Sequence, residues 1–204
     1  SNPEFLREGS AVFDFENPSR IIIGTQDKTT KKLVNSIYKK FLNKAKIINV
    51  DLQTSEMIKY FNNAFYSLLI SFGNEFGNLC SKIKVDFMEI IDGFKHDNRL
   101  HKGKFQDPEF IKYLYPGIGY GGSCFPKDIK ALIEFSKKKK SDLEILKKTD
   151  AVNEAQPKKI SEKVLKILKA KNIKKVLVLG ITFKENSDDL RNSTSVKLIN
   201  YLLK

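Results

Sequence analysis

A glycine-rich loop with one cysteine carries the strongest chemical signal in the sequence. The stretch from Pro116 to Asp128 reads PGIGYGGSCFPKD, and its four glycines allow backbone conformations and close approaches that other residues resist. Asp128 stands where a helix is expected to begin, so Cys124 should lie just before a helix N-terminus. That position and the neighbouring Lys127 both favour the thiolate, the nucleophilic form of cysteine. The loop therefore predicts a nucleophilic Cys124, with a buried, inert cysteine as the alternative.

The other cysteine and the histidines give no metal-binding pattern. Cys80 lies in an apolar helical setting, where an inert, buried role competes with any reactive one. Two cysteines without a CxxC spacing argue against a zinc site or a disulfide framework, and His96 and His101 have no further ligands at suitable spacing. We expect no metal, and a reducing cytoplasm as the compartment.

The loop glycines also match a dinucleotide-binding pattern, but in the wrong context. Gly117, Gly119 and Gly122 have the spacing GxGxxG. Such a motif follows an apolar strand and precedes an acidic residue about 20 positions later. Here Tyr-Leu-Tyr-Pro precedes the glycines and no such acid follows, so we do not assign this loop to a cofactor.

Two polar residues on a predicted long helix could stabilise an oxyanion. Lys59 and Asn63 are four positions apart and therefore share one helix face. Lys59 stands in an otherwise apolar stretch and could direct a cation into a pocket, while Asn63 could donate a hydrogen bond beside it. The alternative is an ordinary solvated face.

A second loop suits a phosphate. The apolar run Lys175–Gly180 predicts a strand, and Lys184 and Arg191 follow it. Loops beyond the carboxyl ends of parallel strands are where α/β domains hold ligands, and both side chains can bind an anionic group. Ordinary loop charge is an equally good explanation.

Residues 1–50 have the pattern of the end of an α/β unit. Arg20–Gly24 and 45–50 read as short buried parallel strands. Thr29 or Thr30 could cap a helix between them. Its expected apolar stripe is Leu33, Val34, Ile37, Phe41 and Leu42.

A long helix is expected from Ser55 to Lys82, capped by Thr54 or Ser55. Apolar residues recur along it at three- and four-residue steps: Ile58, Phe61, Phe65, Leu68, Leu69, Phe72, Phe76 and Leu79. A helix that is apolar over much of its circumference is typical of a bundle centre or a subunit interface. We therefore expect a homodimer formed through this helix.

The rest of the chain alternates helices with one long loop. Patterns predict helices over 86–91, 128–138, 142–171 (with a possible break at Pro157) and Ser193–Leu203, and a loop-rich region over 94–126. The predicted strand Lys175–Gly180 and the helix after it resemble the first β-loop-α unit of another α/β domain.

Composition narrows the functional classes. The chain has 204 residues and a net charge of +13, with 41% hydrophobic and 30% charged residues. No apolar run approaches the roughly 20 residues that span a bilayer, so no membrane segment is expected. The charge could indicate a nucleic-acid partner, but most basic residues are scattered lysines and arginine is scarce, which favours a solvated surface.

Four segments in this order resemble the UDP-glucose/GDP-mannose dehydrogenase family. They are SNPEFLREG (1–9), SEMIKY with NAF (55–60, 63–65), GYGGSCFPKD (119–128) and FK through Arg191 (183–191). The form GGSCFPKD is more similar to the members that act on UDP-glucose than to those that act on UDP-N-acetylhexosamines. The region from Lys102 to Tyr113 is longer than is usual in the family, and the family's glycine-rich NAD motif is absent.

The resemblance implies an α/β fold with a central all-helical domain. Residues 1–50 correspond to the end of a Rossmann-like NAD-binding domain, 51–170 to the central dimerisation and catalytic domain, and 171–204 to the start of a Rossmann-like UDP-binding domain. The implied activity is NAD-dependent four-electron oxidation of UDP-glucose to UDP-glucuronate.

The family mechanism implies particular roles. Cys124 would form a thiohemiacetal and then a thioester, which water hydrolyses. Lys59 and Asn63 would stabilise the oxyanion, while Asp128 and Glu4 would handle protons and water.

The resemblance also implies ligand contacts. Substrate-binding residues would be Phe5, Leu6, Glu8, Tyr113, Leu114, Tyr115, Gly117, Gly121, Lys184 and Arg99, the last reaching a neighbouring subunit's substrate. Lys127 and Arg191 would contact NAD. Two rival readings remain open: a non-catalytic piece or dimerising core of such an enzyme, and, more remotely, a basic nucleic-acid-binding module.

Overall fold

The computed structural model describes residues 1–41, 45–101 and 107–204. These residues form two compact units, one of residues 1–63 with 185–187, the other of residues 64–184 with 188–204. The predicted stripe residue Leu42 and part of the predicted long loop lie outside the described residues.

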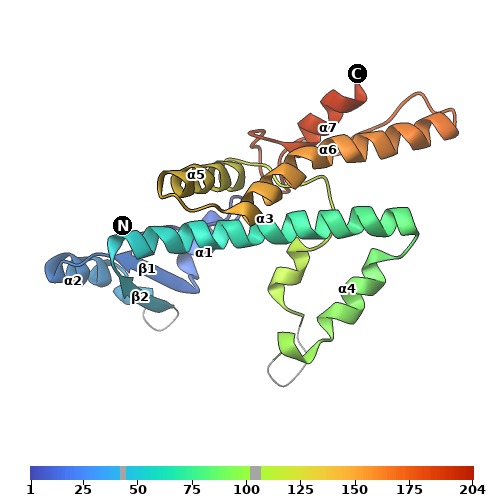
Figure 1. Ribbon diagram of the computed structural model, residues 1–204. Helices are drawn as coiled ribbons and strands as arrows, with labels where there is room; N and C mark the ends of the chain where they lie inside the picture. Colours follow the sequence, from blue (N-terminus) through green and yellow to red (C-terminus); the bar gives the residue numbers. More distant parts are fainter. Residues whose placement is uncertain (42–44, 102–106) are drawn as a thin grey trace. The chain divides into compact units, whose positions relative to one another are not determined.

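The first unit is built on a two-stranded parallel sheet, which confirms both predicted strands (Figure 1). Strand β1 (Arg20–Gly24) pairs with β2 (Lys46–Val50), and Ile21 lies opposite Ile47. Ile21, Ile23 and Phe41 form a buried cluster, against which Val34, Tyr38, Ala45 and Ile47 pack. Burial of these side chains holds the sheet to the residues of helix α2 (Lys28–Ile37) and the 3-10 turn that follows it.

The cap of the first predicted helix differs from the one expected. Helix α2 is capped by the Asp27 side chain, which accepts a hydrogen bond from the Thr30 backbone N–H, so neither Thr29 nor Thr30 is the cap. Both apolar residues Leu33 and Ile37 are exposed, so the predicted stripe covers the core only in part. A short helix, α1 (Ala11–Glu16), was not predicted.

The long helix α3 (Leu52–Ile83) is continuous and begins three residues earlier than predicted. Asp51 replaces Thr54 or Ser55 as the cap. Its carboxylate accepts bonds from the Thr54 backbone N–H (2.8 Å) and hydroxyl (2.6 Å), because aspartate satisfies free N–H groups at a helix start. Residues 52–63 of α3 belong to the first unit and residues 64–83 to the second.

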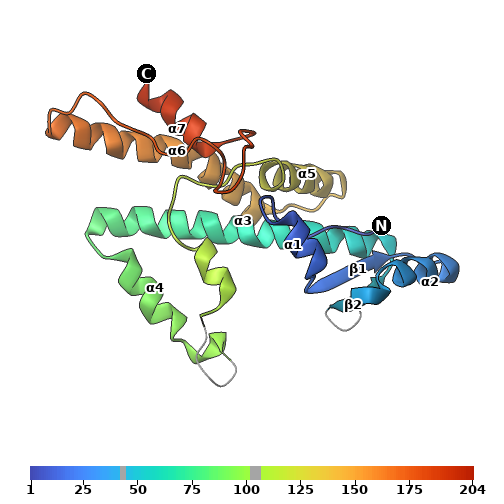
Figure 2. The ribbon, with the colours of Figure 1, turned by 180° about the vertical axis from the view of Figure 1, so that it is seen from behind.

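The second unit contains the remaining helices. They are α4 (Phe87–Lys95), the 3-10 turns Asn98–Leu100 and Glu109–Tyr113, α5 (Phe125–Lys138), α6 (Glu144–Ala170) and α7 (Thr194–Leu202). Helix α4 continues through Gly93 rather than ending at it. Figures 1 and 2 show α7 lying against α6, and Lys197 Nζ bonds Glu154 Oε2 between them at 2.7 Å.

Pro157 does not break α6 as the sequence allowed. A proline inside a helix removes one backbone bond and usually bends the helix. On its N-terminal side, Asn153 and Gln156 each hydrogen-bond the backbone of the segment before α5, and these contacts support α6 at this point.

The predicted strand Lys175–Gly180 is wrong. Residues 173–180 form no strand, and Leu177 and Leu179 are 80% and 85% exposed. A parallel strand is stable only when a neighbour satisfies its backbone groups, and none pairs with this segment in the described part of the chain. The helix after it is confirmed, with Ser193 as its cap.

A segment of backbone packs closely on α3 within the second unit. Ile91, Ile111 and Leu114 form a buried cluster there, with Leu69, Phe87 and Phe110 packed on it. A Cβ added to Gly73 would lie 2.0 Å from the Leu114 carbonyl oxygen, and one added to Gly77 would lie 2.4 Å from Pro116 Cγ. Among the described residues, no helix is long and apolar enough to cross a membrane.

Two helical glycines offer a matched test of this close approach. Gly73→Ala should destabilise the chain by about 1 to 3 kcal/mol, because the new methyl group meets backbone that cannot move aside. Gly93→Ala in α4 has nothing within 4 Å and should stabilise by about 0.5 to 1 kcal/mol through helix propensity alone. Chemical denaturation measures both. Equal effects of the two substitutions would contradict the packing of this segment on α3.

Candidate functional site

Cys124 stands immediately before α5, as predicted, and its side chain is exposed. Its carbonyl oxygen accepts the Asp128 backbone N–H at 2.9 Å and so begins the helix, while its sulfur lies 3.7 Å from Ser123 Oγ. Cys80 is only 3% exposed. The accessible thiol in front of a helix N-terminus is therefore that of Cys124.

Asp128 lies in the first turn of α5 rather than at its start. It is 6% exposed, and Lys127 Nζ donates to its Oδ1 at 2.6 Å, while the Lys127 side chain itself is 68% exposed. The structure thus brings Cys124, Lys127 and Asp128 together at one helix end, with the carboxylate turned inward.

The last turn of the loop is fixed by Phe183, Arg191 and Asn192 of the same unit. Gly122 donates its backbone N–H to the Arg191 carbonyl oxygen (2.9 Å), and Asn192 Nδ2 donates to the Gly122 carbonyl oxygen (3.0 Å). Gly122 has a φ of +79°, and a Cβ there would lie 2.8 Å from the Phe183 ring, so only glycine fits. At Gly121 an added Cβ would lie 2.3 Å from the Asn192 carbonyl oxygen.

Three buried amide side chains, which sequence patterns alone do not identify, bind the rest of the loop. Asn74 on α3, and Asn153 and Gln156 on α6, bond the backbone of Gly117 and Tyr120. In the sequence these residues are amides at helix positions where the periodicity predicts core residues. Without the fold, such amides cannot be told from exposed ones.

Tyr120 is the buried side chain of the loop, at 5% exposure. Its ring packs edge-on against the Phe125 ring, with centroids 5.9 Å apart. Burial, and the charge of the nearby Asp150 carboxylate, raise the pKa of the Tyr120 phenol.

The first unit joins Glu4 and Lys59, two of the predicted catalytic residues. Lys59 Nζ donates to the Glu4 carbonyl oxygen (2.7 Å) and to its carboxylate (3.0 Å). It also lies 5.5 Å from the Phe5 ring centroid, over which the Arg20 guanidinium stacks at 4.2 Å. Asn63, one turn along α3 from Lys59, is 4% exposed.

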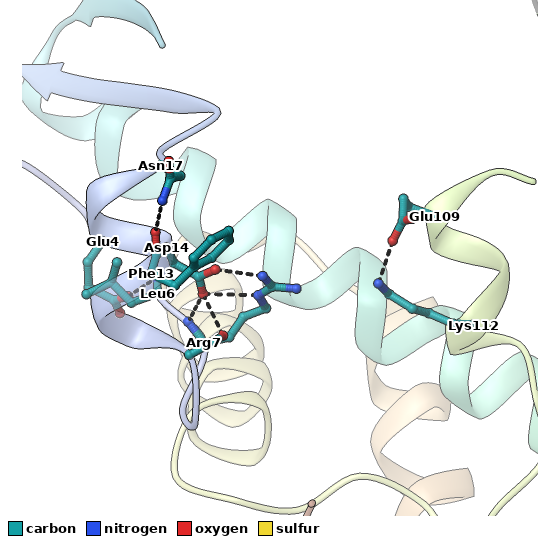
Figure 3. A network of polar contacts seen from close by, with 9 residues as sticks. Glu4, Leu6, Arg7, Phe13, Asp14, Asn17, Glu109 and Lys112 are labelled. Carbon is teal, nitrogen blue, oxygen red and sulfur yellow. Dashed lines mark hydrogen bonds and ion pairs between the residues drawn. The ribbon is translucent and has the colours of Figure 1, made fainter. Parts of the chain in front are cut away.

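A cavity of about 380 Å³ in the first unit is lined in part by Glu4, Phe5 and Leu6. The Glu4 carboxylate accepts the Leu6 backbone N–H at 2.6 Å. Figure 3 shows Arg7 clamped on Asp14, whose carboxylate accepts bonds from both the backbone and the guanidinium of Arg7. These bonds lower the pKa of Asp14 and brace the segment that carries the predicted substrate contacts.

Other predicted ligand contacts have structural partners of their own. In the first unit the Glu8 carboxylate accepts the Ser187 hydroxyl. In the second unit the Arg191 guanidinium pairs with Asp189 at 2.8 Å, and Lys184 lies near the Phe183 ring.

The predicted contacts before the loop differ in exposure. The Tyr113 ring stacks on Tyr66 at 4.3 Å, Leu114 is buried at 5% exposure, and Tyr115 is 42% exposed. Arg99 pairs with Asp97 on an exposed 3-10 turn and lowers the pKa of Asp97 to about 2.

The described residues include no group of three His, Cys, Asp or Glu side chains that could hold a metal ion. For NAD, the exposed Lys127 and Arg191 side chains of the second unit have the charge to contact a pyrophosphate, although Arg191 already pairs with Asp189. They are the candidate NAD contacts among the described residues.

Both family models and individual relatives match this chain. Residues 1–42 match the NAD binding domain of the UDP-glucose/GDP-mannose dehydrogenase family, and residues 53–155 match the central domain of that family. The chain is 39% identical over 202 residues to the UDP-glucose 6-dehydrogenase YwqF of Bacillus subtilis, covering 99% of this chain and 43% of the relative. It is 39% identical over 208 residues to the UDP-glucose 6-dehydrogenase of Rickettsia prowazekii, covering 100% and 45%.

A solved structure also matches the whole of this chain. A UDP-glucose dehydrogenase from Pyrobaculum islandicum superposes with a TM-score of 0.84 at 35% identity, covering 100% of this chain and 44% of that one. The chain therefore spans less than half the length of the relatives it matches. Because the central-domain match alone takes in half of its residues, the chain belongs to the UDP-glucose/GDP-mannose dehydrogenase family.

Proposed function

We propose that this chain carries the thiol-bearing part of an NAD-dependent UDP-glucose 6-dehydrogenase, with Cys124 as the nucleophile. The observation that carries the proposal is the exposed Cys124 at the start of α5, at the end of a loop whose backbone is fixed on both sides. The names of the relatives at 39% identity support UDP-glucose as the substrate. A UDP-N-acetylhexosamine is the alternative.

In this mechanism the sugar C6 alcohol loses a hydride and a proton to give an aldehyde. The Cys124 thiolate attacks the aldehyde carbon and forms a C–S bond, which gives a thiohemiacetal. Loss of a second hydride from that carbon leaves a thioester. Water then breaks the C–S bond, releasing the carboxylate and regenerating the thiol. Two NAD⁺ molecules, bound one after the other, would each accept one of the two hydrides.

The remaining groups stabilise charge and move protons. Lys59 and Asn63 are proposed to stabilise the oxyanion that develops at the former aldehyde oxygen. The contact between Lys59 and the Glu4 carboxylate supports this role, because it holds the ammonium group in place. Glu4 and Asp128 are proposed to handle the proton and the attacking water, and Asp128 is suited to this by its burial beside Cys124.

Proposed substrate contacts occur in each of the two units. Phe5, Leu6 and Glu8 are proposed to contact the nucleotide sugar, and the cavity beside them supports that role. Lys184 and Arg99 keep their proposed roles as substrate contacts, and Lys127 and Arg191 as NAD contacts. The residues Tyr113, Leu114, Tyr115, Gly117 and Gly121 are proposed to shape the sugar site from the loop side.

Alkylation rates test which cysteine is the nucleophile. Iodoacetamide at neutral pH should label Cys124 about tenfold or more faster than Cys80, because only Cys124 is accessible. Peptide mapping by mass spectrometry measures both rates in one sample. In an assembled enzyme, Cys124→Ser should abolish oxidation to the acid, and Cys80→Ser should leave most activity. Preferential labelling of Cys80 would contradict the assignment.

A further prediction concerns turnover. A full-length protein of this family that contains this chain should form about two NADH per UDP-glucose, as covalent capture at Cys124 requires. It should oxidise UDP-N-acetylglucosamine and UDP-N-acetylmannosamine more slowly. The isolated chain should form none, because it lacks the glycine turn that binds a pyrophosphate. NADH produced by the isolated chain, or faster turnover of an acetylated sugar, would overturn the assignment.

We also propose a homodimer formed through α3. The support is the apolar surface that α3 exposes: Phe61, Phe65, Phe72, Phe76 and Leu79 are each between 42% and 71% exposed. Sedimentation equilibrium at micromolar concentration should give twice the chain mass of 23.4 kDa. A monomer under these conditions would contradict a dimer through this helix.

A further inference from the structure

The glycine-rich loop before Cys124 is held by side chains in place of a strand or helix partner. We infer that Asn153 of α6 is the positioning residue of this loop, and that its carboxamide, assisted by those of Asn74 and Gln156, fixes the backbone that presents Cys124. The inference that the loop is fixed stands on contacts alone. Its relevance to catalysis rests on the proposed function of Cys124.

Asn153 makes a paired contact with one residue of the loop. Its Oδ1 accepts the Tyr120 backbone N–H at 2.7 Å, and its Nδ2 donates to the Tyr120 carbonyl oxygen at 3.0 Å. The side chain is 2% exposed, and Tyr120 is 5% exposed. The backbone groups of a buried residue must be satisfied, and a carboxamide is the side chain that can donate and accept in this geometry.

A second amide pair holds Gly117, three residues earlier. Asn74 Oδ1 accepts the Gly117 N–H at 2.7 Å, and Gln156 Nε2 donates to the Gly117 carbonyl oxygen at 2.8 Å. Gln156 Oε1 in turn accepts from Asn78 Nδ2 at 2.8 Å. Asn153 and Gln156 are three residues apart on α6, as Gly117 and Tyr120 are on the loop. One face of α6 therefore binds both loop residues.

Gly117 and Tyr120, the loop residues bound by these amides, lie a few positions before Cys124. Gly119, between them, has a φ of +99°, and a Cβ there would lie 2.6 Å from Asn153 Oδ1, so the loop can approach Asn153 only with glycine at this position. On the other side, the Tyr120 ring packs on Phe125, the residue after Cys124. Fixing the Tyr120 backbone therefore fixes the direction from which the chain enters α5 at Cys124.

The replacement Asn153→Asp tests the donor half of the contact with almost no change of shape. A carboxylate still accepts the Tyr120 N–H but cannot donate to the Tyr120 carbonyl oxygen. A buried carboxyl facing a carbonyl oxygen has a raised pKa, and its protonated form can donate. The variant should therefore keep the clamp at low pH and lose it as the pH rises through that raised pKa. A residue that only fills space would lose stability of the whole fold as the carboxyl ionises, and the α5 reference peptide would then exchange faster together with the loop.

Hydrogen exchange of the whole chain, read by mass spectrometry between about pH 5 and pH 8, is the measurement. In Asn153→Asp, the peptide spanning residues 115–124 should exchange about tenfold faster than in the unmodified chain at the upper pH. The ratio of the two rates should fall toward one at the lower pH. The peptide of α5 spanning 129–136 serves as the internal reference for global opening.

Two further variants keep the test decisive. Ser71→Ala removes a bond from Ser71 Oγ to the Thr149 carbonyl oxygen (2.9 Å), which joins α3 and α6 without touching the loop, and it should leave the loop ratio unchanged. Gln156→Glu removes the donor to Gly117 and should repeat the pH-dependent loss if Asn153→Asp does not fold. Equal loop exchange in Asn153→Asp and the unmodified chain, or an equal effect of Ser71→Ala, would overturn the inference. None of these readouts depends on turnover, so a failure of the proposed reaction would leave them unchanged.

Discussion

The second unit depends on one constraint: a loop without regular structure must satisfy its backbone while lying in contact with two helices. At Gly73 and Gly77 of α3 the loop comes so close that no side chain fits between them. The peptide groups that enter this space lose water, and leaving them without partners would be costly. Amide side chains at Asn74 and Asn153 supply those partners. Glycines on α3 therefore let the loop come close, and amide side chains on α3 and α6 satisfy its backbone there.

The proposed nucleophile and the residues proposed to assist it are each held by contacts within their own unit. The loop and the start of α5 hold Cys124 in an exposed position and Asp128 in a buried one. The first unit holds Lys59 against Glu4, beside a cavity lined by the segment that carries the proposed substrate contacts. Each unit is locally ordered by its own hydrogen bonds, as expected if the groups that form and break bonds are positioned before substrate arrives.

Much of the fold could be predicted because local patterns dominate it. The alternation of short apolar runs gave β1 and β2, and the three- and four-residue repeat gave α3 within three residues at its start. Lys175–Gly180 misled because its apolar run satisfies a strand pattern, whereas strand formation depends on a neighbour that the pattern does not contain. The position of Cys124 just before a helix could be predicted because glycines and a proline mark the loop and the helix start around it. Asn153 could not, because only the tertiary contact with the loop distinguishes it from a surface amide.

Residue-resolved amide exchange in the unmodified chain, followed by NMR, tests most directly whether the loop is held as described. The amides of Gly117, Tyr120 and Gly122 donate to Asn74, Asn153 and the Arg191 carbonyl oxygen. All three should exchange at least about a hundredfold more slowly than an unstructured peptide, because each must break a buried bond before it exchanges. Exchange of all three at the unstructured rate would show that these three hydrogen bonds do not hold the backbone before Cys124, which would contradict the structure as described.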